Sequence, residues 1–227
     1  MTMQVNAQYN VAAPESLPVR IAGFQRRKMY AEFLAQFPPD QTASVIDVGV
    51  TADRSYEHSN YLVAWYPHKD RITAVGLDDA GFLETVYPGV KFVQADGRDL
   101  PFDDGAFDVA HASAVLEHVG NAERQTTFLR ELWRVSRRGI FITTPNRWFP
   151  VEFHTVLPLV HWLPKPMFRG ILARTGRAFF ADESNLNLIG PGELKQLARD
   201  AGIANPQIDT VSLGGWPTNL LLSARKA

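Results

Sequence analysis

Residues 90–119 read VKFVQADGRDLPFDDGAFDVAHASAVLEHV and contain two short, mostly apolar runs, at 90–95 and 107–111. Similar runs lie on either side of this stretch, at 44–49 (SVIDVG), 72–77 (ITAVGL) and 139–144 (GIFITT). Runs that are apolar through their whole length are typical of parallel strands whose two faces are both buried. The sequence therefore predicts five parallel strands in this part of the chain.

Segments with helical spacing lie between and around these runs. The clearest covers 121–137, another covers 191–201, and a third begins near Arg20 with apolar residues spaced three and four apart. The expected inner face of that third helix consists of Ile21, Phe24, Tyr30, Phe33, Leu34 and Phe37. Two final runs, at 207–213 and 218–224, are expected to form an antiparallel hairpin.

This alternation predicts an α/β fold: a doubly wound, Rossmann-like sheet of seven mostly parallel strands, with an antiparallel edge hairpin and helices on both faces. We expect residues 41–227 to form this domain and residues 1–40 to form an arm and a helix that act as a lid. Residues 145–190 interrupt the alternation with many prolines and aromatic side chains. A long segment of this kind inside a compact domain is usually functional, so we expect a cap over the ligand site, after the fifth strand.

The composition excludes several kinds of site. The chain has 227 residues, no cysteine, and a formal net charge of −1 at pH 7. Without cysteine there are no disulfides, zinc–thiolate sites, iron–sulfur clusters or cysteine nucleophiles. The near-zero charge gives no electrostatic basis for binding nucleic acid, and no apolar run is long enough for a membrane span. Without a basic start followed by an apolar block, the chain is expected to be cytoplasmic.

Acidic residues follow three of the expected strands, and the carboxyl ends of parallel strands are where such sheets bind ligands. Gly49 comes directly after the first strand and allows a tight turn, but it is the single glycine of this turn. A loop that binds pyrophosphate needs several glycines, so the site favours a cofactor without phosphates. Asp78 is placed to accept hydrogen bonds from both hydroxyls of a ribose, and Asp96 is placed to contact an adenine.

Four strings together resemble the class I S-adenosylmethionine-dependent methyltransferases of the bacterial small-molecule type: VIDVG at 45–49, ITAVGLDD at 72–79, the block at 90–119, and ELWRVSRRGIFITTPN at 131–146. The resemblance covers about residues 44–146 and implies S-adenosylmethionine as the cofactor. It assigns cofactor contacts to Asp47, Gly49, Thr51, Asp78, Asp79, Asp96, Gly97, Arg98, His111 and Ala112. The chain departs from the family at Thr51 and Asp53, where further glycines are common.

Methyl transfer is an in-line displacement, so positioning and the exclusion of water can supply most of the catalysis. A base is needed only where the acceptor carries a proton on its reacting atom, and the candidates are His118, Glu152, His154 and His161. Candidate substrate contacts are Tyr9 on the N-terminal arm, Ser113 after the fourth strand, and Asn146, Arg147 and Trp148 after the fifth. Glu152, His154 and His161 do not have the spacing of a helical zinc motif, so no metal is predicted.

The leading interpretation is a methyltransferase that acts on a small molecule, with no nucleic-acid or membrane partner. An enzyme of the same fold could instead let the amine of S-adenosylmethionine attack its own carbon chain and release methylthioadenosine. A protein that binds the cofactor without turnover is a third interpretation. A nicotinamide-dependent oxidoreductase is a fourth, and the missing glycines count against it. The sequence does not identify the acceptor or the oligomeric state.

Overall fold

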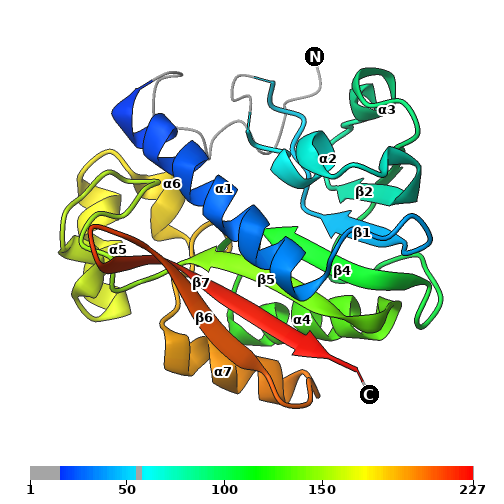
Figure 1. Ribbon diagram of the computed structural model, residues 1–227. Coiled ribbons are helices and arrows are strands. Elements are labelled where there is room, and N and C mark those ends of the chain that lie inside the picture. The colour runs from blue at the N-terminus through cyan, green and yellow to red at the C-terminus, as the bar shows by residue number, and fades with distance from the viewer. Residues whose placement is uncertain (1–15, 55–57, 227) are drawn as a thin grey trace.

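The computed structural model describes residues 16–54 and 58–226, which form one mixed sheet with helices on both faces (Figure 1). The strand order is β3-β2-β1-β4-β5-β7-β6. The strands are β1 (Val45–Val48), β2 (Ile72–Gly76), β3 (Lys91–Gln94), β4 (Phe107–Ser113), β5 (Ser136–Pro145), β6 (Gln207–Leu213) and β7 (Trp216–Arg225). Neighbouring strands from β3 to β5 are parallel, whereas β7 is antiparallel to both β5 and β6. The predicted seven-stranded, doubly wound sheet with an antiparallel edge pair is therefore confirmed.

Helices cover the two faces of the sheet in separate groups, with α1, α2 and α3 on one face and α4 and α7 on the other (Figure 1). The α-helices are α1 (Leu17–Gln36), α2 (Tyr61–Trp65), α3 (Phe82–Val86), α4 (Ala122–Val135), α5 (Lys165–Arg174), α6 (Ala178–Ala181) and α7 (Pro191–Asp200). Short 3-10 helices occur at η2 (Lys69–Arg71), η3 (Leu116–His118) and η4 (Val160–Trp162). Within residues 16–54 and 58–226, no helix combines the length and the apolarity that crossing a membrane requires.

A stripe of apolar side chains packs α4 against the face of the sheet that α4 and α7 cover. Leu129 and Leu132 of α4 are fully buried and belong to the same cluster as Ile140 of β5. The helix is amphipathic, so this stripe faces the sheet, and the charged side chains of the helix lie outside the stripe. It begins at Asn121, whose side-chain oxygen accepts a hydrogen bond from the Arg124 backbone N–H at 3.0 Å.

α1 packs against the opposite face of the sheet. Phe33 is fully buried, and its ring centroid lies 5.4 Å from that of His111 and 5.5 Å from that of Phe141. The predicted inner position of Phe24 is wrong, because its side chain is 53% exposed. The Phe24 ring lies instead on the solvent side of the helix, 4.7 Å from Lys28 Nζ.

The insertion at 145–190 has a small core of its own. Phe168 and Leu172 of α5 and Phe180 of α6 are buried against one another and against the chain that leads to α7. The predicted insertion with short helices is therefore confirmed, and two of its aromatic residues serve to hold it together. It connects β5 to α7 and lies at the carboxyl ends of the parallel strands, as Figure 1 shows.

The loop between β3 and β4 is fixed by two charged residues of α4. The Glu131 carboxylate accepts a hydrogen bond from Leu100 N–H at 2.9 Å. The Arg134 guanidinium donates to the backbone oxygens of Leu100 and Phe102, at 3.0 and 2.7 Å, and to Glu131 at 2.7 Å. This loop contains Asp96, so α4 helps to position a residue of the ligand site.

Candidate active site

A cavity of about 380 Å³ lies at the carboxyl ends of β1, β2, β3 and β4, and the insertion contributes His154 and Asn185 to its wall. Small-molecule sites commonly have volumes of roughly 300–1,000 Å³. The predicted site residues that line this cavity are Gly49, Thr51, Asp96, Gly97, Arg98, Ser113, His118 and His154. This end of the sheet is where a doubly wound fold binds its ligands.

The turn after β1 approaches the cavity through Gly49. Its φ is +98°, and a Cβ atom there would lie 2.1 Å from Val115 Cγ2, so only glycine fits. Beyond it, Thr51 N–H donates to Asn60 Oδ1, and Asn60 Nδ2 donates back to Thr51 O, both at 2.9 Å. The Asn60 side chain thus fixes a turn that lacks the additional glycines common in the family.

Asp96 follows β3 and lies in the cavity wall beside Gly97 and Arg98. Arg98 donates to Asp96 Oδ1 from its Nε atom at 3.0 Å and from its backbone N–H at 2.9 Å. The side-chain bonds from Arg98 hold the pKa of Asp96 below its ordinary value, despite partial burial. A Cβ atom on Gly97 would lie 2.6 Å from the Phe128 ring and 2.8 Å from Val48 Cγ1, so the backbone requires glycine here.

Asp78 and Asp79 both follow β2 but occupy different surroundings. Asp78 is half-buried and comes directly after Leu77, which lines the cavity. Asp79 is exposed, and its Oδ1 atom accepts a hydrogen bond from Gly81 N–H at 2.8 Å. Asp79 therefore stabilises the turn before α3, and Asp78 is the carboxylate that adjoins the cavity wall.

Besides Asp78 and Asp79, three more of the predicted cofactor residues do not line the cavity. Asp47 and His111 are paired across β1 and β4, and His111 Nδ1 donates to Asp47 Oδ1 at 2.7 Å. Tyr61 Oη donates to His111 Nε2 at 3.0 Å on the side of the sheet that α1 covers. Ala112 is fully buried in the core of the other face. These residues support the strands that carry the cavity, and their side chains do not line it.

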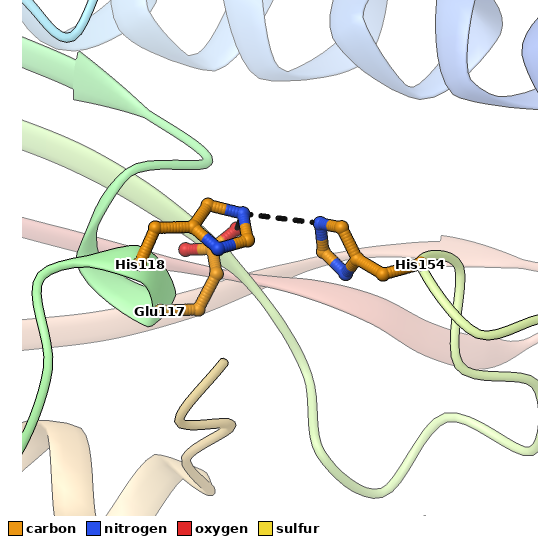
Figure 2. A group of neighbouring side chains, drawn as sticks. All are labelled: Glu117, His118 and His154. Carbon is orange, nitrogen blue, oxygen red and sulfur yellow. Dashed lines mark hydrogen bonds and ion pairs between the residues drawn. The ribbon is translucent and has the colours of Figure 1, made fainter. Parts of the chain in front are cut away.

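Three of the four catalytic candidates lie together, although they come from two distant segments. His118, at the end of η3, and His154, in the insertion, have their Nε2 atoms 3.1 Å apart (Figure 2). Glu152 Oε1 accepts a hydrogen bond from His154 Nδ1 at 2.7 Å, and His118 Nδ1 donates to Asn185 O at 2.7 Å. The fourth candidate, His161, lies elsewhere, with its Nε2 atom bonded to Phe149 O at 2.7 Å.

Glu117 is a functional candidate that the sequence reasoning missed. Its side chain is fully buried beneath the histidine pair, and burial raises the pKa of Glu117 to about 7. Glu117 Oε2 accepts a hydrogen bond from Thr144 Oγ1 at 2.9 Å. Glu117 Oε1 has no hydrogen-bond partner among the residues that the structure describes, and it lies 3.9 Å from His118 Nε2. The signal available in the sequence was the position of Glu117 directly before His118, in the string LEHV.

The charges of this cluster are set by burial and by mutual contact. Burial opposes the ionisation of Glu152, but the charge of His154 and the hydrogen bonds from His154 and Thr155 outweigh it and lower the pKa of Glu152 to about 2. Burial disfavours the charged form of His154, but Glu152 prevails and raises the pKa of His154. Burial and the neighbouring charge of His154 lower the pKa of His118 to about 3. Glu152 is therefore an anion that favours a positive charge next to it.

Comparison with solved structures shows the same fold. A possible histamine N-methyltransferase from Thermotoga maritima is 16% identical, covers 93% of this chain and 92% of its own, and superposes with a TM-score of 0.60. A putative sarcosine dimethylglycine methyltransferase from Galdieria sulphuraria is 13% identical, covers 93% and 91%, and has a TM-score of 0.59. PigF, solved with SAH, is 19% identical, covers 91% and 56%, and has a TM-score of 0.56.

Sequence comparison finds similarity to methyltransferases over part of the chain. Residues 60–143 match the family model described as a methyltransferase domain. Demethylmenaquinone methyltransferases of Staphylococcus aureus strains are 26% identical over 149 residues, which are 64% of this chain and 58% of theirs. These matches support the resemblance of this chain to the class I S-adenosylmethionine-dependent methyltransferases. The chain spans about 58% of the length of these curated relatives.

The polar groups around the cavity fit S-adenosylmethionine, the cofactor of these methyltransferases. S-adenosylmethionine carries no phosphate, and the cavity has a single glycine turn after β1 rather than a phosphate-binding loop. The adenosine part of S-adenosylmethionine offers N–H and O–H donors. The Asp78 and Asp96 carboxylates, which follow β2 and β3, are acceptors suited to those donors. Gly97, where any side chain would collide with the core, keeps the backbone next to Asp96 close to the cavity.

The predicted substrate residues divide between the cavity and the base of the insertion. Ser113 lines the cavity, and its hydroxyl is bonded to Thr143 Oγ1 at 2.8 Å. Asn146 and Arg147 are buried, and their side chains bond backbone carbonyl groups instead of lining the cavity. Asn146 Nδ2 donates to Pro217 O at 3.1 Å, and Arg147 Nη2 donates to Leu163 O at 2.9 Å.

Trp148 is 47% exposed and does not line the cavity. Tyr9 lies outside the described residues. The cavity wall also includes Arg26 and Arg124, which the sequence reasoning did not assign to the site.

Proposed function

We propose that this chain transfers a methyl group from S-adenosylmethionine to a small-molecule acceptor. One observation carries the proposal: a single cavity joins the strand ends that suit the cofactor to the histidine pair of η3 and the insertion. A chamber of about 380 Å³ is suited to a cofactor and a compact acceptor, rather than to a folded macromolecule.

The cofactor is expected to lie across the ends of β1, β2 and β3. Asp78 accepts hydrogen bonds from the ribose hydroxyls in this arrangement, and Asp96 accepts one from the adenine amino group. A carboxylate has about four lone-pair sites, so Asp96 retains acceptor capacity beyond its bonds to Arg98. The turn at Gly49 and Thr51 then lies next to the methionine part of the cofactor.

The acceptor is expected at the other end of the cavity, next to His118 and His154. When bound, S-adenosylmethionine would supply an electrophilic methyl carbon: the acceptor would form a bond to this carbon in line with the carbon–sulfur bond, which would break and release S-adenosylhomocysteine. His118 and His154 are the histidines that line the cavity, and the buried Glu152 carboxylate stabilises positive charge on this pair. We assign these two histidines to promoting the loss of the acceptor's proton, where the acceptor has one at its reacting atom.

The test is turnover by the purified full-length chain. The protein is incubated with S-adenosylmethionine alone and with a panel of small acceptors that includes quinone-derived phenols, since the Staphylococcus relatives are named as demethylmenaquinone methyltransferases. Mass spectrometry then follows the cofactor and the acceptor. S-adenosylhomocysteine together with an acceptor heavier by one methyl group supports the proposal. Methylthioadenosine formed from the cofactor alone would instead identify a cyclase or lyase.

A further inference from the structure

The imidazoles of His118 and His154, at the end of the cavity, face each other with their Nε2 atoms. His118 Nδ1 is bonded to Asn185 O, and His154 Nδ1 is bonded to Glu152 Oε1, each at 2.7 Å. A carbonyl and an ionised carboxylate only accept hydrogen bonds, so both Nδ1 atoms carry hydrogens. Both Nε2 atoms therefore present lone pairs to each other unless a positive species lies between them, and their separation is 3.1 Å.

That positive species is either a proton or a metal ion, and the surroundings distinguish the two. A proton shared by two nitrogen atoms needs no third ligand. The structure nevertheless aims a third ligand at the same point, because Glu117 Oε1 is buried, has no hydrogen-bond partner among the described residues, and lies 3.9 Å from His118 Nε2. One ligand atom from each of Glu117, His118 and His154 lies within 4.8 Å of the others, as Figure 2 illustrates.

We infer that Glu117, His118 and His154 bind one divalent transition-metal ion. Two nitrogen atoms that each lie at roughly 2.0–2.1 Å from zinc, at about a right angle, are about 3 Å apart, as these Nε2 atoms are. The three ligand atoms lie within 4.8 Å of one another, so the widest pair has to close by up to about 1.4 Å to reach the separation of roughly 3.4 Å in a tetrahedral zinc site. Two imidazoles and one carboxylate suit zinc, cobalt, iron or manganese better than calcium or magnesium, which favour oxygen ligands.

Groups around the cluster already orient its ligands. Metal-binding histidines usually donate their other N–H group to a carboxylate or a backbone carbonyl, and here Glu152 and Asn185 accept those two bonds. The ligating carboxylate is also held, because Thr144 Oγ1 donates to Glu117 Oε2 at 2.9 Å. All three ligands therefore have a partner that fixes their orientation in the absence of an ion.

The site has the composition of a catalytic metal centre. Three protein ligands leave at least one coordination position open, which is the arrangement of catalytic rather than structural zinc sites. His118 and His154 line the cavity, so the open position faces it. If the chain has the proposed function, on which this step rests, the acceptor is a molecule with a hydroxyl or enol oxygen that enters this position and loses its proton more readily there.

The test of the site is metal binding by the full chain, after any affinity tag is removed and metals are stripped with a chelator. Co²⁺ and Zn²⁺ are titrated separately. We expect one ion per chain and, for Co²⁺, visible absorption bands of a low-coordinate complex. X-ray absorption of the zinc-loaded protein should show two imidazole ligands at roughly 2.0–2.1 Å, a result that requires no variant. Failure to bind either ion stoichiometrically would overturn the inference in favour of a shared proton.

Variants separate this site from other histidines. His118→Ala, His154→Ala and the nearly isosteric Glu117→Gln should each weaken Co²⁺ binding by more than about tenfold, and Glu152→Gln by about 10–100-fold through lost orientation. His68→Ala is the matched control, because His68 lies near η2, outside the cluster, and it should bind Co²⁺ as the wild-type does. Circular dichroism checks that each variant is folded. Unchanged binding in the folded cluster variants would contradict the assignment.

S-adenosylmethionine binding, measured by calorimetry on the stripped and the metal-loaded protein, keeps the two proposals distinguishable. Stoichiometric metal binding without cofactor binding leaves the site standing and removes the methyltransferase proposal. Cofactor binding and full methyl transfer by a protein that binds no metal would support the methyltransferase proposal and would overturn the metal site.

Discussion

His111 Nδ1 lies 2.7 Å from Asp47 Oδ1, and the two residues sit opposite each other on β4 and β1. Both side chains are almost fully buried, at 1% and 6% exposure, and Tyr61 completes the chain of hydrogen bonds from α2. This network ties α2 and the two central strands together on the face that α1 covers. It lies behind the cavity, so its effect on the cofactor is through the position of the strand ends.

Asp47→Ala therefore tests whether this carboxylate supports the fold or binds the cofactor. The substitution leaves a buried imidazole N–H without its acceptor, which should lower the free energy of unfolding by about 1.5–3 kcal/mol. The Kd for S-adenosylmethionine should stay within about threefold of the wild-type value, a change below about 0.7 kcal/mol. Denaturant unfolding and calorimetry measure the two quantities. A stable variant that has lost the cofactor would show that Asp47 contacts the ligand directly.

Asp78→Asn should weaken S-adenosylmethionine binding by about 10–150-fold, which corresponds to the roughly 1.5–3 kcal/mol of a hydrogen bond to a charged group. Asp79→Asn is the matched control, since the neighbouring side chain is exposed and bonds Gly81 N–H instead. Calorimetric titration of both variants gives the comparison. If the control loses as much affinity as Asp78→Asn, or if neither variant loses any, the ribose assignment fails.

Gly97→Ala places a methyl group 2.6 Å from the Phe128 ring and 2.8 Å from Val48 Cγ1. Relief of that overlap must move the backbone beside Asp96, so we expect weaker cofactor binding and a loss of about 1–3 kcal/mol of stability. Gly192→Ala is the control, because nothing lies within 4 Å of a Cβ atom at that position in α7. There the change should be neutral or should raise the thermal midpoint, because alanine favours a helix. Equal effects at both glycines would contradict the crowding at Gly97.

The contact of Glu131 with the β3–β4 loop should make stability depend on pH. Hydrogen bonds from Arg134 are the main reason that the pKa of Glu131 lies below its ordinary value of 4.5. A carboxyl group with a lowered folded-state pKa stabilises the fold above its unfolded value, and this stabilisation is lost as the pH falls through the folded value. The difference in thermal midpoint between wild-type and Glu131→Gln should thus be constant near neutral pH and shrink below pH 4.5. A difference that does not change with pH would contradict this role.

The sheet could be predicted because its strands are nearly continuous apolar runs, and the run of Phe107 to His111 shows both the strength and the limit of that signal. Composition identifies a buried strand, but it does not tell which face a polar side chain such as His111 occupies. Asp47 and His111 follow the family's motif positions in sequence, yet their side chains bond to each other.

The acceptor end of the site was less predictable, for a physical reason. His118 and His154 are 36 residues apart, and only the path of the insertion brings their Nε2 atoms together. Each was a candidate as a single residue, whereas their pairing was not visible. Glu117 was overlooked because a carboxylate is usually solvated, and only the structure shows that this one is fully buried.

The most direct test of the central claim is a crystal structure of the chain with S-adenosylhomocysteine. The account predicts the ribose hydroxyls on Asp78, the adenine beside Asp96, and the sulfur atom facing the end of the cavity that His118 and His154 line. A structure with the nucleoside bound at the histidine end, or outside this cavity altogether, would contradict it.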